Sequence, residues 1–168
     1  KSLAGPLFTT SFWKRRPFSN LWGWGLGLNG EIGEGLNQQR NAPVPIGTDG
    51  DWTEVKSGLN HTLALKGLGE LWTWGLNTSS QLGDGSNAPS NVPLKIGIDY
   101  WSQIDAESHH SFGIKADGTL WAWGDNSSSE LGIWYSDRPL PVGNFSGVSQ
   151  ISTRNGFVLV TKTDNTLW

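Results

Sequence analysis

The chain has 168 residues, of which 36% are apolar and 16% charged, and it is rich in glycine (23) and tryptophan (11). This composition is typical of one turn-rich β domain whose core rests on a few large aromatic rings. The net charge of −3 gives no field that attracts phosphate backbones, so we expect no nucleic-acid binding, and the absence of cysteine excludes disulfides and thiolate metal sites.

Residues 1–20 contain few periodic features, and we interpret them as an irregular N-terminal arm or a degenerate strand. They include the densest basic and aromatic cluster of the chain, which consists of Trp13, Lys14, Arg15 and Arg16. Such a cluster suits a phosphate, an anionic glycan or an acidic protein surface, with the ring stacking on the ligand. The alternative interpretation is a solvated arm or a tether between subunits.

No stretch of the sequence has the length and apolarity of a signal peptide or a transmembrane span. The arm lacks an apolar core of signal-peptide length, and the longest aliphatic and aromatic run, residues 157–160, is far too short to cross a bilayer. We therefore expect no membrane insertion, and the sequence leaves the compartment undetermined. Because the chain has no methionine, even at position 1, we expect a processed chain or a part of a longer protein.

The motif Leu-Trp-x-Trp-Gly recurs along the rest of the chain. It occurs at residues 21–25, 71–75 and 120–124 and begins again at 167–168, at intervals of 50, 49 and 47 residues. A near-constant period of this length is typical of repeat architectures. We therefore divide residues 21–168 into tandem copies, which are 21–70, 71–119, 120–166 and the start of a fourth at 167–168.

Each copy contains about four short segments with the features of strands. One segment alternates around a leading Trp or Val, at residues 52–55, 101–104 and 148–151. Glycine, asparagine, aspartate, serine and proline separate the segments, and no window sustains the period of a helix. Four short strands at this period are typical of the blades of a β-propeller, in which neighbouring blades must stack because one blade cannot bury both of its faces.

The full pattern is Leu-Trp-x-Trp-Gly-x-Asn-x-Ser-x-x-Leu-Gly, then Trp-x-x-Val/Ile, then His-Thr/Ser-x-x-Leu/Ile-Lys-x-x-Gly-x-Leu-Trp. It resembles the regulator of chromosome condensation repeat family over about residues 21–168. Members of that family typically close seven repeats into a propeller. The resemblance therefore implies an all-β fold with blades of four short antiparallel strands. About three blades are present, about half of a ring, and such an open arc exposes edge strands that favour association with other strands.

Recurrent aromatic and histidine positions are expected to fill the space between blades. His61 and His110 share one repeat position, which the third copy fills with Phe157, so we assign both histidines to the structural core. His109 and His110 are adjacent on a predicted strand and point to opposite faces, so they cannot chelate a metal together. The tryptophans assigned to the core are Trp22, Trp24, Trp52, Trp72, Trp74, Trp101, Trp121 and Trp123.

Three stretches vary in length or character between the copies: residues 31–42, 83–91 and 133–138. We expect them to form a recognition face, because propellers present variable loops on a stiff framework. Trp134 has no aromatic counterpart in the other copies and is followed by Tyr135. These two residues are the candidate hot spot for a partner.

No catalytic, cofactor or metal motif is supported by its context. Residues 25–30 match the letters of a dinucleotide fingerprint, but no helix follows that could receive a pyrophosphate. Residues 125–130 resemble the start of a calcium loop but lack its later glycine and glutamate. We therefore expect a non-enzymatic protein without a cofactor or a bound metal.

These observations favour a non-catalytic protein-interaction or structural module, a scaffold within a larger assembly such as a virion or a cell surface. Its expected partners are other proteins or neighbouring subunits. The resemblance implies an alternative, a guanine-nucleotide exchange or chromatin-binding regulator. A glycan-binding or enzyme-binding propeller is a further alternative.

Overall fold

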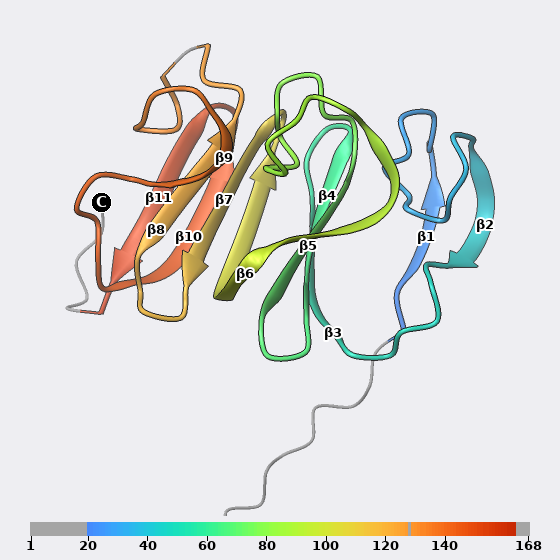
Figure 1. Ribbon diagram of the computed structural model, residues 1–168, viewed down its shortest axis with the longest axis horizontal. Helices are drawn as coiled ribbons and strands as arrows, with labels where there is room; N and C mark the ends of the chain where they lie inside the picture. Colours follow the sequence, from blue (N-terminus) through green and yellow to red (C-terminus); the bar gives the residue numbers. More distant parts are fainter. Residues whose placement is uncertain (1–19, 128, 164–168) are drawn as a thin grey trace, which may run out of the picture.

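The computed structural model describes residues 20–127 and 129–163, and these residues form antiparallel β-strands without a helix (Figure 1). None of them therefore provides a helix that could span a membrane. The strands are β1 (Trp22–Gly25), β2 (Arg40–Pro45), β3 (Trp52–Ser57), β4 (His61–Lys66), β5 (Glu70–Gly75), β6 (Ser90–Glu107), β7 (His110–Lys115), β8 (Leu120–Gly124), β9 (Ser136–Pro141), β10 (Val148–Arg154) and β11 (Phe157–Lys162).

Two complete four-stranded blades form the middle of the chain. The first blade consists of β3, β4, β5 and the first part of β6, and the second consists of the rest of β6 with β7, β8 and β9. The long strand β6 changes partner at its centre, since Tyr100 lies opposite a residue of β5 and Trp101 lies opposite a residue of β7. The two blades are thus continuous in hydrogen bonding although each has its own four strands.

A two-stranded sheet lies at each end of the described residues, β1–β2 on one side and β10–β11 on the other. β1 carries the Leu-Trp-x-Trp-Gly motif of β5 and β8, so β1 and β2 correspond to the third and fourth strands of a blade. β10 and β11 align with β3 and β4 and correspond to the first and second strands. Each sequence copy therefore joins the last two strands of one sheet to the first two strands of the next.

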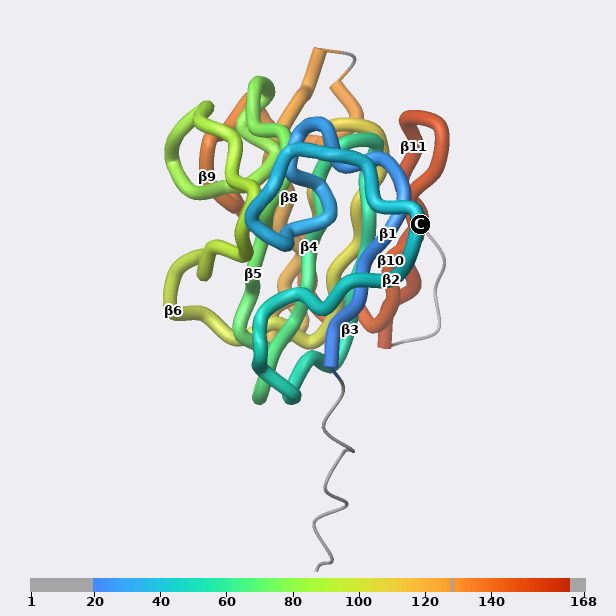
Figure 2. The backbone as a smooth tube through the Cα atoms, turned by 90° about the vertical axis from the view of Figure 1, so that its right-hand side faces the viewer, coloured from blue at the N-terminus to red at the C-terminus, as the bar shows by residue number. Residues whose placement is uncertain are grey.

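The four sheets stack in chain order (Figure 1), and Figure 2 looks along this stack from the β1–β2 end. The first strands of successive sheets approach each other along one side. There the side-chain amide of Gln103 on β6 bonds the backbone of Ile151 on β10, and the Asp105 carboxylate accepts bonds from the backbone and hydroxyl of Thr153. This architecture is an incomplete β-propeller.

Three hydrophobic clusters fill the three spaces between successive sheets. Trp52, Ala64 and Trp74 pack with Leu21 between β1–β2 and the first blade. Trp101 and Trp123 lie at the centre of the cluster between the two complete blades, and aliphatic side chains together with Phe112 fill the third space. Trp74 and Trp123 are almost fully buried, whereas Trp72 and Trp121 lie half-buried at the edges with their rings roughly perpendicular to those of Trp52 and Trp101.

The assignment of Trp22 and Trp24 to the core is wrong, because their side chains are 51% and 63% exposed. Of their counterparts on β5, Trp74 is covered by the preceding sheet and Trp72 is half-buried at the edge of the same cluster. Among the described residues no sheet lies on that side of β1. The rings therefore occupy core positions of the repeat without a neighbour to cover them.

Replacing Trp123 with alanine should lower the free energy of unfolding by about 3–5 kcal/mol, because the change leaves a cavity between the two complete blades. Trp134→Ala is the matched control, since that ring is 91% exposed and its loss should change stability by less than about 0.5 kcal/mol. Urea titration followed by circular dichroism measures both values. Equal stability of the two variants would contradict the assignment of Trp123 to the core.

Candidate interaction face

Three long loops connect the third strand of a sheet to its fourth, at residues 26–39, 76–89 and 125–135. All three emerge on the same side of the stack, the upper side in Figure 1. We call this surface the loop face. It includes most of the stretches that vary between the repeats, so it is the candidate functional site.

Asn77, which is buried, and Asn126, which is half-buried, hold two of these loops in a fixed shape. The Asn77 side-chain amide donates to the carboxylate of Asp84 at 3.1 Å and to the carbonyl of Ala88 at 3.1 Å. Its oxygen accepts the N–H of Leu82 at 2.9 Å. Asn126 holds the next loop in the same way. Because these bonds are internal to each loop, the loops do not depend on a ligand for their order.

The base of the middle loop is bonded to the neighbouring blade through the carbonyl of Gln81. This oxygen accepts the indole N–H of Trp123 at 3.0 Å and the hydroxyl of Ser111 at 2.7 Å. The preceding junction repeats this arrangement, since the Glu31 carbonyl accepts the indole N–H of Trp74 at 2.9 Å and the hydroxyl of Thr62 at 2.9 Å. A loop carbonyl thus joins the first blade to the β1–β2 sheet and the second blade to the first.

The buried side chain of His61 also contacts this junction, because it bonds the Ser111 hydroxyl. Its Nε2 lies 2.9 Å from the Ser111 hydroxyl oxygen. Because that hydroxyl donates its hydrogen to the Gln81 carbonyl, its oxygen accepts a hydrogen bond from the N–H at His61 Nε2. The neutral imidazole therefore carries its hydrogen on Nε2 and none on Nδ1. Burial lowers the pKa of His61 to about 3, with His109 and His110 adding to the shift. His61 is therefore a neutral, buried group at neutral pH.

His110 occupies the equivalent position of the second blade and is also buried. Its Nδ1 lies 2.9 Å from the carbonyl of Asp125, and its Nε2 lies 3.8 Å from Glu130 Oε1. His110 therefore bonds the base of the loop that follows β8, whereas His61 bonds Ser111 on strand β7. Within the part of the chain that the structure describes, no three histidines or carboxylates are grouped in a way that could hold a metal ion.

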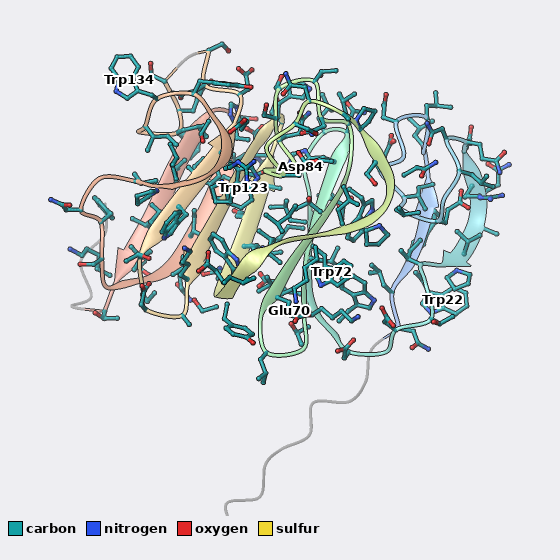
Figure 3. All side chains as sticks on the ribbon, viewed as in Figure 1. Trp22, Glu70, Trp72, Asp84, Trp123 and Trp134 are labelled. Carbon is teal, nitrogen blue, oxygen red and sulfur yellow. The ribbon has the colours of Figure 1, made fainter. Side chains whose placement is uncertain are left out.

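Trp134 is the most prominent aromatic side chain of the loop face, 91% exposed and directed away from the blades (Figure 3). Its neighbour Tyr135 is 55% exposed and is anchored, because its hydroxyl lies 2.5 Å from the hydroxyl oxygen of Ser80 in the preceding loop. Ser80 in turn donates to the side-chain oxygen of Asn87. The exposed ring of Trp134 thus follows directly on a loop that Tyr135 connects to the loop of the preceding blade.

The structure brings Trp134 and Tyr135 together with Ser80, a residue that sequence reasoning did not select. The sequence shows only a serine at this position where the first copy has Gly30, and the structure adds that Ser80 and Ser129 adopt positive φ angles of 60° and 66°. A serine at a glycine-like position marks a tight turn that is held by other contacts. The basic cluster from Trp13 to Arg16 lies outside the described residues.

The chain matches known repeat profiles over more than half of its length. The regulator of chromosome condensation (RCC1) repeat profile matches residues 19–65 and 69–114. A second RCC1 repeat profile matches residues 52–81 and 101–130. No curated protein sequence matches the chain.

Solved structures show the same fold at low identity. Human WBSCR16 is 20% identical, with a TM-score of 0.75 over 89% of this chain and 42% of that protein. Prp20p from Saccharomyces cerevisiae is 18% identical, with a TM-score of 0.50 over 91% of this chain and 53% of that one. The same yeast protein bound to Kap60 is 19% identical, with a TM-score of 0.50 over 92% of this chain and 53% of that one. The chain thus spans about half of these proteins or less.

His61 should make the stability of the protein pH-dependent. Its pKa is near 6.5 in the unfolded chain and about 3 in the fold, so the unfolded state binds the additional proton between these values. The contribution of His61 is complete above pH 6.5 and is lost as the pH falls toward 3, by about 1.4 kcal/mol per pH unit. Urea titrations from pH about 6.5 to about 4 should show a shallower dependence for His61→Gln. Identical slopes for the two proteins would contradict the burial of a neutral imidazole.

Proposed function

This chain belongs to the regulator of chromosome condensation (RCC1) repeat family, and we propose that it is a non-catalytic module that binds a protein partner through its loop face. One observation carries the proposal: the free ring of Trp134 beside the anchored ring of Tyr135. Tryptophan and tyrosine are enriched among the residues that dominate protein-protein binding energy. A repeat fold of stacked blades is a stiff support for such a site.

The surroundings of Trp134 resemble the anatomy of an interface. Ile133 is half-buried next to it, while Asp137 and Arg138 are exposed and provide a polar rim of both charges. The base of the loop is fixed further by the N–H of Gly85, which donates to the Asp137 carbonyl at 2.9 Å. Since these bonds hold the loop before binding, the loop loses less conformational entropy when a partner contacts the ring.

The ionisable groups of the loop face support a binding role over a catalytic one. Asp84 accepts bonds from Ser86, and Arg40 forms a two-bonded ion pair with Glu34. These groups shape the loops, and His61 is neutral and buried beneath them. We further propose that this module is part of a larger assembly, such as a virion or a cell surface. Exposed strand edges, which favour association with other strands, support this proposal.

The yeast protein Prp20p suggests specific candidates for the partner class. Prp20p binds Gsp1p and histones, and it has also been solved in a complex with Kap60. Gsp1p, histones and Kap60, or their counterparts in the source organism, are therefore suitable probes for this chain. Nucleotide release from purified small GTPases should not accelerate when the chain is added, and an acceleration would contradict the non-catalytic role.

Trp134→Ala should weaken binding to the partner by at least about 30-fold, the effect of losing a hot-spot ring. Trp22→Ala is the matched control, because that ring is also exposed but belongs to β1. Proteins bound to immobilised wild type in an extract of the source organism are compared with those bound to each variant, and the affinity of the purified partner is then measured by calorimetry. A partner that binds the Trp134→Ala variant as tightly as wild type would contradict the proposal.

A further inference from the structure

We propose that the surface opposite the loop face is a second contact surface, which binds a basic protein segment that carries apolar side chains. This surface consists of the turn at residues 67–69, the centre of β6 at residues 98–100 and the turn at residues 116–119. All three lie at the lower ends of the two complete blades in Figure 1, and we call them the turn face. The proposal goes beyond the function of the loop face, because it concerns other residues and another partner.

Three apolar side chains are exposed on the turn face. Leu68 and Ile98 are 89% and 90% exposed, and Tyr100 is also exposed. Tyr100 lies opposite Glu70 in the pairing of β5 with β6, and Leu68 precedes Glu70 by two residues. Ile98 precedes Tyr100 by two residues, so both side chains lie on the same side of the strand. The three residues therefore form one apolar patch at the junction of the two complete blades.

The fold does not require apolar residues at these positions. The corresponding residues of a neighbouring copy are Asp117 for Leu68, Thr48 for Ile98 and, counted back from the leading tryptophan, Asp51 for Tyr100. The other copies thus form comparable turns with polar side chains, and core packing does not explain three exposed apolar side chains at one junction. An exposed apolar patch with polar surroundings is typical of a contact surface for another protein.

The lysines of the turn face are withdrawn from solvent. The Lys66 ammonium lies 5.0 Å from the ring centre of Trp72, and the Lys115 ammonium lies 3.3 Å from the ring centre of Trp121. Both side chains pack along these rings and are only 15% and 14% exposed. Their positive charges are therefore directed into the molecule, where the aromatic faces stabilise them.

The carboxylates that pair with these lysines face outward. Asp49 and Asp99 form the ion pairs at 2.7 Å and 2.9 Å, and their side chains are 53% and 54% exposed. Asp51 is partly exposed, and its carbonyl accepts the N–H of Gly67 at 2.9 Å, directly before Leu68. Asp99 lies between the two exposed residues of β6. The apolar patch thus has solvent-facing negative charge on both sides.

This arrangement determines the chemistry of the partner. Leucine, isoleucine or aromatic side chains of a partner would cover the patch, and flanking lysines or arginines would meet the exposed carboxylates. Nucleic acid and an anionic lipid surface carry the same sign of charge as these carboxylates and would be repelled. A basic, amphipathic protein segment is therefore the occupant that fits. Because the loop face lies on the other side of the stack, both surfaces can be occupied at once.

A synthetic amphipathic helix of leucine and lysine is a suitable probe, titrated into the full chain by calorimetry and located by nuclear magnetic resonance. The wild type should bind it at the turn face, and a helix of leucine and glutamate should not bind. The double variant Leu68→Asp, Ile98→Thr should bind the basic helix at least about 10-fold more weakly, because two apolar contacts are lost. Purely ionic attraction would survive, since the variant gains a negative charge.

The two replacements are residues that neighbouring copies already contain at these positions, so the double variant should keep the near-ultraviolet circular dichroism of wild type. Asp99→Asn should weaken binding of the basic helix and reduce its salt dependence. Trp134→Ala is the matched control and should bind this helix as wild type does, which separates this test from that of the loop face.

Three results would overturn the proposal. The first is a wild type that does not bind the basic helix, and the second is a double variant that binds it as tightly as wild type. The third is binding that appears only after deletion of residues 1–19, because the basic and aromatic cluster of the chain itself would then be the occupant of the turn face.

Discussion

A bond between a buried indole and a loop carbonyl of the preceding sheet joins the sheets at two of the three junctions in the described stack. Trp74 and Trp123 each fill the space between two sheets and donate the indole N–H to the carbonyl of Glu31 or Gln81. The apolar ring provides the burial that a single blade cannot achieve, and the directed bond fixes the position of the blade against its neighbour. The arrangement of a buried indole bonded to a loop carbonyl occurs at two successive junctions of the stack.

The same bond connects the core to the surface. Gln81 belongs to the loop that Asn77 holds together and that presents Ser80 to Tyr135. A partner that contacts Trp134 therefore meets a loop whose base is part of the junction between blades. The middle loop is thus fixed both by its internal bonds and by the bond of its base to the next blade.

The sequence predicted the repeat family, the strand segments and the positions that carry the inter-blade rings. It failed at Trp22 and Trp24, because equivalence within a repeat does not reveal whether a neighbouring sheet covers the residue. The sequence copies begin at the motif, and in the structure each copy joins the last two strands of one sheet to the first two strands of the next. The contact of Ser80 with Tyr135 could not be predicted, since it depends on how two loops from different blades meet.

Exchange of the indole protons with solvent, measured by nuclear magnetic resonance on the isotopically labelled chain, is a direct test of these junctions. We predict that the Trp74 and Trp123 indole protons are strongly protected, because both rings are buried and both nitrogens donate to carbonyls. The exposed indole of Trp134 should exchange at the rate of an unfolded chain. Exchange of Trp74 and Trp123 as fast as that of Trp134 would contradict the bond that we place at the centre of each junction.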